Sequence, residues 1–272
     1  MSSFVSIPRR TQARQSFGLT SVFAWLLLGL SQVAVAHEPQ QLPPCEDQQS
    51  PNVHCYGVKL DQRNTKYQGG LLNGRPHGHG QIEYANGARY HGSFSGGRKS
   101  GVGEFVTRKG DRYVGEFKAG RMQGEGTWTR VTGEKYVSSI VRGQFHGQGV
   151  QYFNDGTTYT GSFKAGRRDG LGEVRAPSGA RFVGQFRQGK RHGLGTQWHP
   201  NGQVFVGEYH NGRREGLGVR YSARGQVLSS GRWHGGKLLE AFAIEDARFA
   251  FPGSGLNKAQ GPIEPRRYLD SA

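Results

Sequence analysis

The sequence predicts an all-β protein, an elongated and twisted solenoid built as a single sheet of consecutive antiparallel β-hairpins. First, an aromatic residue recurs every 23 residues, without insertion or deletion, at Tyr67, Tyr90, Tyr113, Tyr136, Tyr159, Phe182 and Phe205. Second, glycines recur at fixed offsets from each of these aromatics. Third, only 34% of the residues are hydrophobic, which is too few for a large conventional core. A fixed period of this length indicates a repeat architecture, in which each unit packs against its neighbours.

Each copy of the repeat contains two short strand signals. Tyr113, Gly115 and Phe117 alternate with other residues, and this period of two is typical of a half-buried strand. A second strand is expected after the Gly-x-Gly of each copy, as at residues 126–129. Pairs such as Asn86-Gly87 stand between copies and are typical of hairpin turns. Each copy is therefore expected to form one hairpin that leads into the next.

The repeated aromatics and glycines are expected to build the core together. One hairpin is too small to bury its own rings, so stacked copies must share them. Glycine in the strand leaves room for a neighbouring ring to lie over the backbone. We therefore expect a ladder of rings. In the fourth copy Ser138 replaces the strand glycine, Ile140 the second aromatic and Gln144 a basic residue. This copy is expected either to pack less well and bend the sheet, or to differ without structural consequence.

The pattern Tyr-x-Gly-x-Phe-x-x-Gly-x-x-x-Gly-x-Gly, seen most cleanly from Tyr113 to Gly126, resembles the MORN repeat (membrane occupation and recognition nexus). The resemblance covers seven copies over residues 67–227. It implies a meander of hairpins and a role as a scaffold, tether or assembly module. For some family members phospholipid head groups are proposed ligands. The repeat also accompanies kinase and methyltransferase domains, but no such domain is recognisable in this sequence.

Residues 1–36 are predicted to be a secretory signal peptide. Three arginines lie within the first 14 residues, residues 22–30 are apolar, and Ala34-Val35-Ala36 gives the small-x-small pattern of a cleavage site. An uncleaved membrane anchor is the alternative, because residues 16–36 are about long enough to span a bilayer. We therefore expect an exported protein, periplasmic, in the cell envelope or secreted, or one that this segment anchors in a membrane.

Residues 37–66 are interpreted as a linker that ends in a capping strand near residues 58–60. Cys45 and Cys55 are the two cysteines of the chain, and in an oxidising compartment their separation suits a small disulfide loop. A zinc site is disfavoured, because His54 beside Cys55 does not complete a set of four ligands.

The C-terminal part of the chain is expected to close the stack. Residues 228–250 hold a partial eighth copy, Gly231 to Lys237, that is one residue out of register. Apolar residues then follow at a roughly helical spacing, which predicts a short capping helix within residues 237–250: Leu238, Leu239, Phe242 and Phe249. Residues 251–272 are rich in Gly and Pro and are expected to be a flexible tail.

The net charge of +16 favours negatively charged partners. Residues 67–227 contain 24 Lys and Arg against 11 Asp and Glu, so the repeats carry most of it. One position is basic in six of seven copies and gives the candidate anion-binding residues: Arg75, Arg98, Arg121, Arg167, Lys190 and Arg213. The next position adds Lys99, Arg168, Arg191 and Arg214 on what is expected to be the same loop. Either this edge binds anions, or basic residues merely keep exposed turns soluble.

No catalytic pattern is recognisable. Paired carboxylates do not recur, and no nucleophile elbow or phosphate-binding loop is present. His77, His146 and His192 share one repeat position, but their copies are not adjacent and are too far apart to share a metal ion. The sequence predicts a non-enzymatic protein with no cofactor, metal or small-molecule substrate.

The predicted function is protein–protein assembly, self-association included. The alternative is electrostatic docking to anionic lipid head groups or other polyanions through the basic edge. Nucleic acid is a weaker alternative, because the aromatics that would stack on bases fall at core positions and because export removes most such roles.

Overall fold

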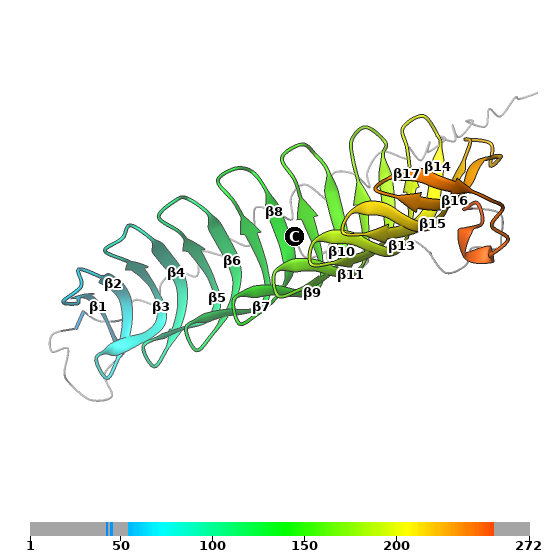
Figure 1. The fold of residues 1–272 in the computed structure, drawn as a ribbon. Coiled ribbons are helices and arrows are strands. Elements are labelled where there is room, and N and C mark those ends of the chain that lie inside the picture. Colours follow the sequence, from blue (N-terminus) through cyan, green and yellow to red (C-terminus); the bar gives the residue numbers. More distant parts are fainter. Residues whose placement is uncertain (1–41, 43, 46–53, 253–272) are drawn as a thin grey trace, which may run out of the picture. The chain divides into compact units, whose positions relative to one another are not determined.

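The computed structural model describes residues 42, 44–45 and 54–252; the predicted signal peptide and residues 253–272 lie outside the described residues. The described chain forms one open antiparallel sheet of 17 strands, which confirms the all-β hairpin solenoid (Figure 1). The strands are β1 His54–Leu60, β2 Lys66–Leu72, β3 Arg75–Glu83, β4 Arg89–Ser95, β5 Arg98–Val106, β6 Arg112–Lys118, β7 Arg121–Thr129, β8 Lys135–Val141, β9 Gln144–Tyr152, β10 Thr158–Lys164, β11 Arg167–Arg175, β12 Arg181–Arg187, β13 Lys190–Trp198, β14 Val204–His210, β15 Arg213–Tyr221, β16 Val227–His234 and β17 Lys237–Ala241.

Each strand pairs with the strands before and after it in the chain, so every connection is a hairpin. The hairpins follow one another in a row, and each one bends along its length (Figure 1). The pairing register shifts at a fixed place in the copies, as between Gly92 and Phe94. A bulge of this kind bends a strand, which accounts for the repeated curvature.

Two kinds of turn alternate along the sheet. Inside a copy, both central residues are left-handed, as at Ala165 (φ 51°) and Gly166 (φ 77°), which is the tight two-residue hairpin turn. Between copies the turn is wider and is closed by bonds such as Gly87 N–H to the Tyr84 carbonyl, 2.8 Å. Because the inner turn is so short, the second strand is longer than expected. β7, for example, already begins at Arg121 and includes the Gly-x-Gly.

The ring that opens each copy lies across a pair of glycines. Gly115 and Gly126 are paired between β6 and β7, and a Cβ added to Gly126 would lie 2.4 Å from Cε2 of Tyr113. Tyr113 is therefore fully buried, and its hydroxyl donates to the Glu116 carbonyl, 3.1 Å away, at the bend. The glycines thus make room for a neighbouring ring to lie over the backbone, and that ring belongs to their own copy.

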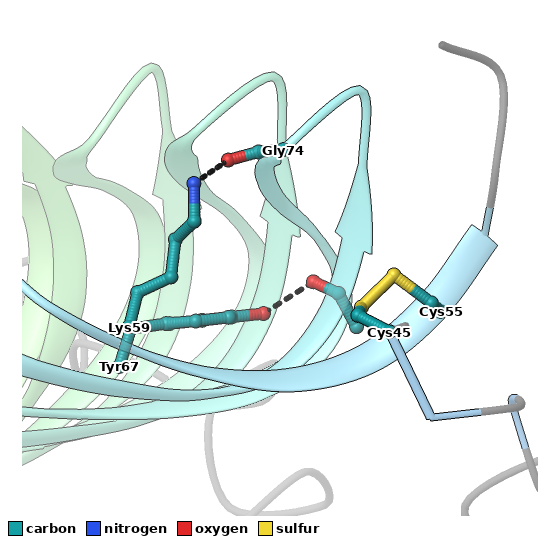
Figure 2. The surroundings of a disulfide bond; sticks show 6 residues. Cys45, Cys55, Lys59, Tyr67 and Gly74 are labelled. Atoms are coloured by element: carbon teal, nitrogen blue, oxygen red, sulfur yellow. Dashed lines mark hydrogen bonds between the residues drawn. A yellow bond between two sulfur atoms is a disulfide. The ribbon is translucent and has the colours of Figure 1, made fainter. Parts of the chain in front are cut away.

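The rings form the expected ladder. Tyr90, for example, meets Phe94 of its own copy and Phe117 of the next copy edge-to-face, with centroids 5.2 and 4.9 Å apart. We call the face of the sheet that carries this ladder the inner face. Figure 2 shows the ring of Tyr67 on the inside of the bend, with its hydroxyl directed at a backbone carbonyl.

The fourth copy interrupts the ladder without interrupting the sheet. Ser138 pairs with Gly149 and is 2% exposed, so its side chain occupies the space that a ring fills elsewhere. The ring of Tyr136 instead stacks on Phe145, with centroids 4.8 Å apart and planes 8° apart. The buried rings consequently fall into two clusters, and Phe145 contacts both. The ring contacts of this copy therefore differ from those of the other copies, while poorer packing and a bend of the sheet at this copy stay a prediction.

The N-terminal end of the ladder is covered by β1, which is the expected capping strand. Cys45 and Cys55 are joined by a disulfide, with their Cα atoms 5.0 Å apart (Figure 2). Cys55 is 3% exposed and belongs to the first ring cluster. Lys59 reaches across the bend and donates to the Gly74 carbonyl (Figure 2). The disulfide thus holds residues 44–45 against the end of the core.

Replacing both cysteines by alanine is expected to lower the free energy of unfolding by about 2–3 kcal/mol, because the short loop they close is then free in the unfolded chain. Urea titration followed by circular dichroism measures the change. Adding a reductant to the unsubstituted chain should give the same shift of the midpoint. Leu60→Ala is the control, because Leu60 is 69% exposed on the same strand and should change little. An unchanged midpoint in both experiments would contradict the role assigned to the disulfide.

The short capping helix expected within residues 237–250 is present only as a single 3-10 turn. Residues 237–241 are β17, which pairs with β16 and completes an eighth hairpin, and one 3-10 turn, η1, spans Ala247–Phe249. Pairing satisfies backbone groups along the edge of β16, and the weak helical spacing of the apolar residues does not compete with it. Trp233 lies edge-to-face on Phe205, 5.0 Å away, so the eighth hairpin extends the ladder.

The cap itself lies on the opposite face of the sheet. Phe249 is 1% exposed and packs with buried residues of β14 and β15 such as Val206 and Val219. The hydroxyl of Tyr221 donates to the Phe249 carbonyl, 2.7 Å away. The segment after β17 therefore covers the outer face at the C-terminal end and leaves the inner face of these copies to other side chains.

Candidate functional site

Six basic residues occupy one exposed edge of the sheet. We call Arg75, Arg98, Arg121, Arg167, Lys190 and Arg213 the edge row. Each one is the first residue of the second strand of its copy, directly after the tight turn, and each is exposed. Successive copies are two strands apart, about 9.6 Å. Within the described part of the chain, no carboxylate lies within 4.0 Å of any of them. Anion binding by this row stays a prediction.

The next residue of each copy points to the inner face, because side chains alternate along a strand. We call these residues the inner row: Pro76, Lys99, Met122, Phe145, Arg168, Arg191 and Arg214. Each is paired across its hairpin with the second core residue of the copy, as Arg191 is with Phe186. All seven are partly buried. The expectation that Lys99, Arg168, Arg191 and Arg214 share a loop edge with the edge row is therefore wrong.

The cations of the inner row cover the rings of the ladder. The guanidinium carbon of Arg191 lies 4.4 Å from the ring centroid of Phe182, and that of Arg214 lies 4.3 Å from the centroid of Phe205. Arg168 lies 5.5 Å from the centroids of both Tyr159 and Phe186. A guanidinium stacked on a ring keeps its N–H groups free at its edge, so these side chains retain donors for another group.

Lys99 is held differently from the arginines. Its Nζ lies 4.9 Å from the ring centroid of Phe105, 5.3 Å from those of Tyr90 and Phe117, and 5.8 Å from that of Tyr84. Burial lowers the pKa of the Lys99 ammonium. Four rings thus surround this cation, and its role is to cover the core by cation–π contact.

The three inner arginines lie close enough to influence one another. Burial lowers the pKa of Arg168 and of Arg191, and the charges of Arg214 and Arg168 lower that of Arg191 further. Among the residues that the structure describes, no carboxylate lies within 4.0 Å of any of the three. This is a partly buried cluster of positive charge with no counter-charge, which is an unfavourable arrangement for the chain alone.

The hydrogen bonds of this cluster go to neutral acceptors. Arg168 donates to the Gly189 carbonyl at 3.0 Å, and Arg191 donates to Gln197 Oε1 at 3.3 Å. Arg214 lies 2.9 Å from His199 Nε2. Burial lowers the pKa of His199, and the charges of Arg214, Arg191 and Arg220 lower it further, so this ring is neutral and its Nε2 accepts from Arg214. Neutral acceptors orient the guanidinium groups without cancelling their charge.

The inner row changes chemistry along the sheet. It is apolar in the third and fourth copies, where Met122 and Phe145 pack against the ring clusters, and cationic in the fifth to seventh copies. The sequence already contains this difference, but only the strand assignment shows that these side chains face the ladder. The alternation of side chains could have shown this from the sequence. If the second strand is taken to begin at Arg98 or Arg167, the next side chain falls on the face that carries the ladder.

The MORN repeat model matches seven consecutive segments, residues 67–89, 90–112, 113–135, 136–158, 159–181, 182–204 and 205–227. The chain belongs to the MORN repeat family. The resemblance inferred from the sequence is thereby confirmed over the same seven copies, and the eighth hairpin lies beyond the matched segments. No curated protein matches the chain.

The solved structures that resemble the chain weakly include three of TCP domains. One is the SAS-4 (dCPAP) TCP domain of Drosophila melanogaster in complex with a proline-rich motif of Ana2 (dSTIL), with 14% identity, 65% of this chain and 90% of that chain covered, and a TM-score of 0.39. The other two are a point mutant and the wild type of the Danio rerio CPAP TCP10 domain, the latter with a STIL peptide. They share 13% and 12% identity, cover 65% of this chain and 99% of theirs, and have TM-scores of 0.27 and 0.18. Likeness this low does not bear on function.

The described strands offer no candidate metal centre. Within residues 42, 44–45 and 54–252, no group of three or more His, Cys, Asp or Glu side chains is arranged to hold a metal ion. No helix in that part of the chain is long and apolar enough to cross a membrane. The MORN repeats and their hairpin sheet point to a binding protein, and the edge row and inner row are the surfaces on which binding can be tested.

Proposed function

We propose that this MORN-repeat protein is a non-enzymatic scaffold of the secretory or envelope compartment that binds a partner protein along its sheet. The observation that carries the proposal is the unpaired inner cluster of Arg168, Arg191 and Arg214. Partly buried charges without counter-charge are unfavourable in the free chain and become favourable when a partner supplies the opposite charge. The aromatics and glycines of each copy build the ladder, so the remaining side chains are the ones that can contact a partner.

The partner interaction is tested by reconstitution. The full-length protein is captured from its native compartment, the associated proteins are identified, and each one is purified and recombined with the chain. We expect one of them, or a second copy of this chain, to form a complex of defined mass in size-exclusion chromatography with light scattering. A chain that stays monomeric, and that forms no complex with any purified candidate, would refute the scaffold.

The compartment is tested on the same material by measuring the mass of the mature protein. Cleavage after Ala36 predicts an N-terminus at His37, in line with the small-x-small pattern of residues 34–36. A mature protein that retains Met1 together with membrane association would support the anchor instead. A mature protein that retains Met1 in a soluble cytoplasmic fraction would refute export altogether.

A second candidate function, docking to anionic membranes, is favoured by the edge row, whose six exposed cations lie along one side of the sheet. Each basic residue close to an anionic bilayer contributes about 1 kcal/mol. We expect co-sedimentation with anionic but not neutral vesicles, and loss of sedimentation when Arg98, Arg121, Arg167 and Arg213 are changed to Gln. Absence of sedimentation with anionic vesicles at low salt would exclude this function.

A further inference from the structure

We propose that Arg168, Arg191 and Arg214 bind an acidic segment of the partner protein in polyproline II conformation, with one carboxylate at every third residue. The proposal rests on the scaffold function proposed above and names the chemistry and the geometry of its ligand. The three guanidinium groups come from equivalent positions of consecutive copies, so they form a regular row rather than a chance patch.

The spacing of the row selects the conformation of the ligand. Consecutive arginines are separated by two strands, about 9.6 Å. A polyproline II helix advances about 3.1 Å per residue and turns once in three residues, so residues i, i+3 and i+6 face one side and are about 9.3 Å apart. An extended β-strand would place residues three apart on opposite faces, because its side chains alternate. A polyproline II segment therefore presents one side chain to each arginine in turn.

The chemistry of the row selects carboxylates. Each guanidinium already lies over a ring, Arg191 over Phe182, Arg214 over Phe205 and Arg168 over Tyr159, and so is placed before a ligand arrives. The free N–H groups at its edge match the two oxygens of a carboxylate. Gln197 Oε1 accepts from Arg191 and from the Tyr209 hydroxyl, at 3.3 and 3.2 Å, and this fixes the direction in which the guanidinium points.

The position of the row favours a chain-like ligand over a flat surface. The inner arginines are partly buried on the face that carries the ladder, whereas the edge row is exposed at the hairpin ends. A bilayer would meet the edge row first. Buried donors that lie over rings are reached more easily by single side chains of a narrow peptide.

The experiment uses the full chain and three labelled nonapeptides of nearly equal size in fluorescence anisotropy at low ionic strength. The probe repeats Glu-Pro-Pro three times. Its isomer carries the three Glu residues together, followed by six Pro. The neutral analogue repeats Gln-Pro-Pro. We expect the spaced probe to bind roughly 10- to 100-fold more tightly than the isomer, because only the spaced probe can form three ion pairs at once. The neutral analogue should not bind measurably.

Two triple variants with the same change in charge then locate the site. Arg168→Gln, Arg191→Gln and Arg214→Gln together should lower the affinity for the spaced probe by roughly 10- to 100-fold. The control, Arg167→Gln, Lys190→Gln and Arg213→Gln, removes three charges from the edge row of the same copies and should leave most of the affinity. Circular dichroism melts show whether each variant keeps its sheet. The comparison of the two isomers on the unsubstituted chain needs no variant and decides the spacing independently.

Three results would overturn the proposal: equal affinity for the spaced probe and its isomer, equal loss in both triple variants, or displacement of the probe by anionic vesicles with the same dependence on the inner arginines. The last result would assign the row to lipid head groups. If a reconstituted partner complex forms equally well with the inner triple variant, the inference fails while the scaffold function stands.

Discussion

Changing Phe182 to alanine is expected to lower the free energy of unfolding by about 3–5 kcal/mol, the usual range for a buried Phe. Phe182 is 1% exposed and meets Phe186 and Tyr209 edge-to-face, with centroids 5.5 and 5.1 Å apart. It also supports the guanidinium of Arg191. Because Tyr209 belongs to the next copy, the change weakens both the copy and its contact with its neighbour.

Urea unfolding measured by circular dichroism and by tryptophan fluorescence checks this prediction, since coincident curves show whether the repeats unfold together. Leu171→Ala is the control on the adjacent strand, because Leu171 is 56% exposed and its loss should change stability by less than about 0.5 kcal/mol. Tyr136→Ala should cost less than Phe182→Ala, since Tyr136 stands where the ladder is interrupted. Equal effects at Phe182 and Leu171 would contradict the ladder as the source of stability.

The fold could be predicted from the sequence because its physical requirements recur in every copy. The 23-residue step fixes the hairpin, and the paired glycines, such as Gly115 and Gly126, leave room for the ring that lies across them. A Cβ added to Gly115 would also lie 2.6 Å from the Gly126 Cα on the paired strand. Features that recur in all seven copies can therefore be predicted from the sequence alone. The capping helix was not predictable in this way, because residues 237–241 occur once and their state depends on the unpaired edge of β16.

The candidate site could be predicted from the sequence only in part. The sequence showed two adjacent basic positions in the fifth to seventh copies, Arg167 and Arg168 among them, but not that the strand begins at the first of them. If the start of a strand is misplaced by one residue, every side chain of that strand is assigned to the opposite face of the sheet. The edge row was therefore correctly identified as exposed, while the inner arginines were assigned to the wrong side. Their contact with the rings depends on the bend at each bulge, which no local pattern specifies.

Changing Gly126 to alanine is expected to destabilise the protein by about 3 kcal/mol through overpacking alone. The three nearest atoms to the added Cβ all belong to the ring of Tyr113, at 2.4, 2.5 and 2.6 Å. That ring is fully buried and is held by Phe117 and Trp128, with centroids 5.3 and 6.2 Å away, so it has little freedom to move aside. Alanine at this position is compatible with the backbone, and the clash is therefore the cause.

A double-mutant cycle separates the clash from backbone strain. With Tyr113→Ala already in place, the space is open, and Gly126→Ala should cost less than about 1 kcal/mol, a coupling that is typical of residues in direct contact. Gly120→Ala is the matched control in the same hairpin. Gly120 has φ 85° and nothing within 4 Å of an added Cβ, so its alanine variant is strained by about 1–2 kcal/mol in either background. If Gly126→Ala costs the same with and without the Tyr113 ring, the glycine serves the backbone and not the ring. If its cost disappears with the ring, the two residues form one packing unit, and that contact explains the second glycine of the repeated Gly-x-Gly.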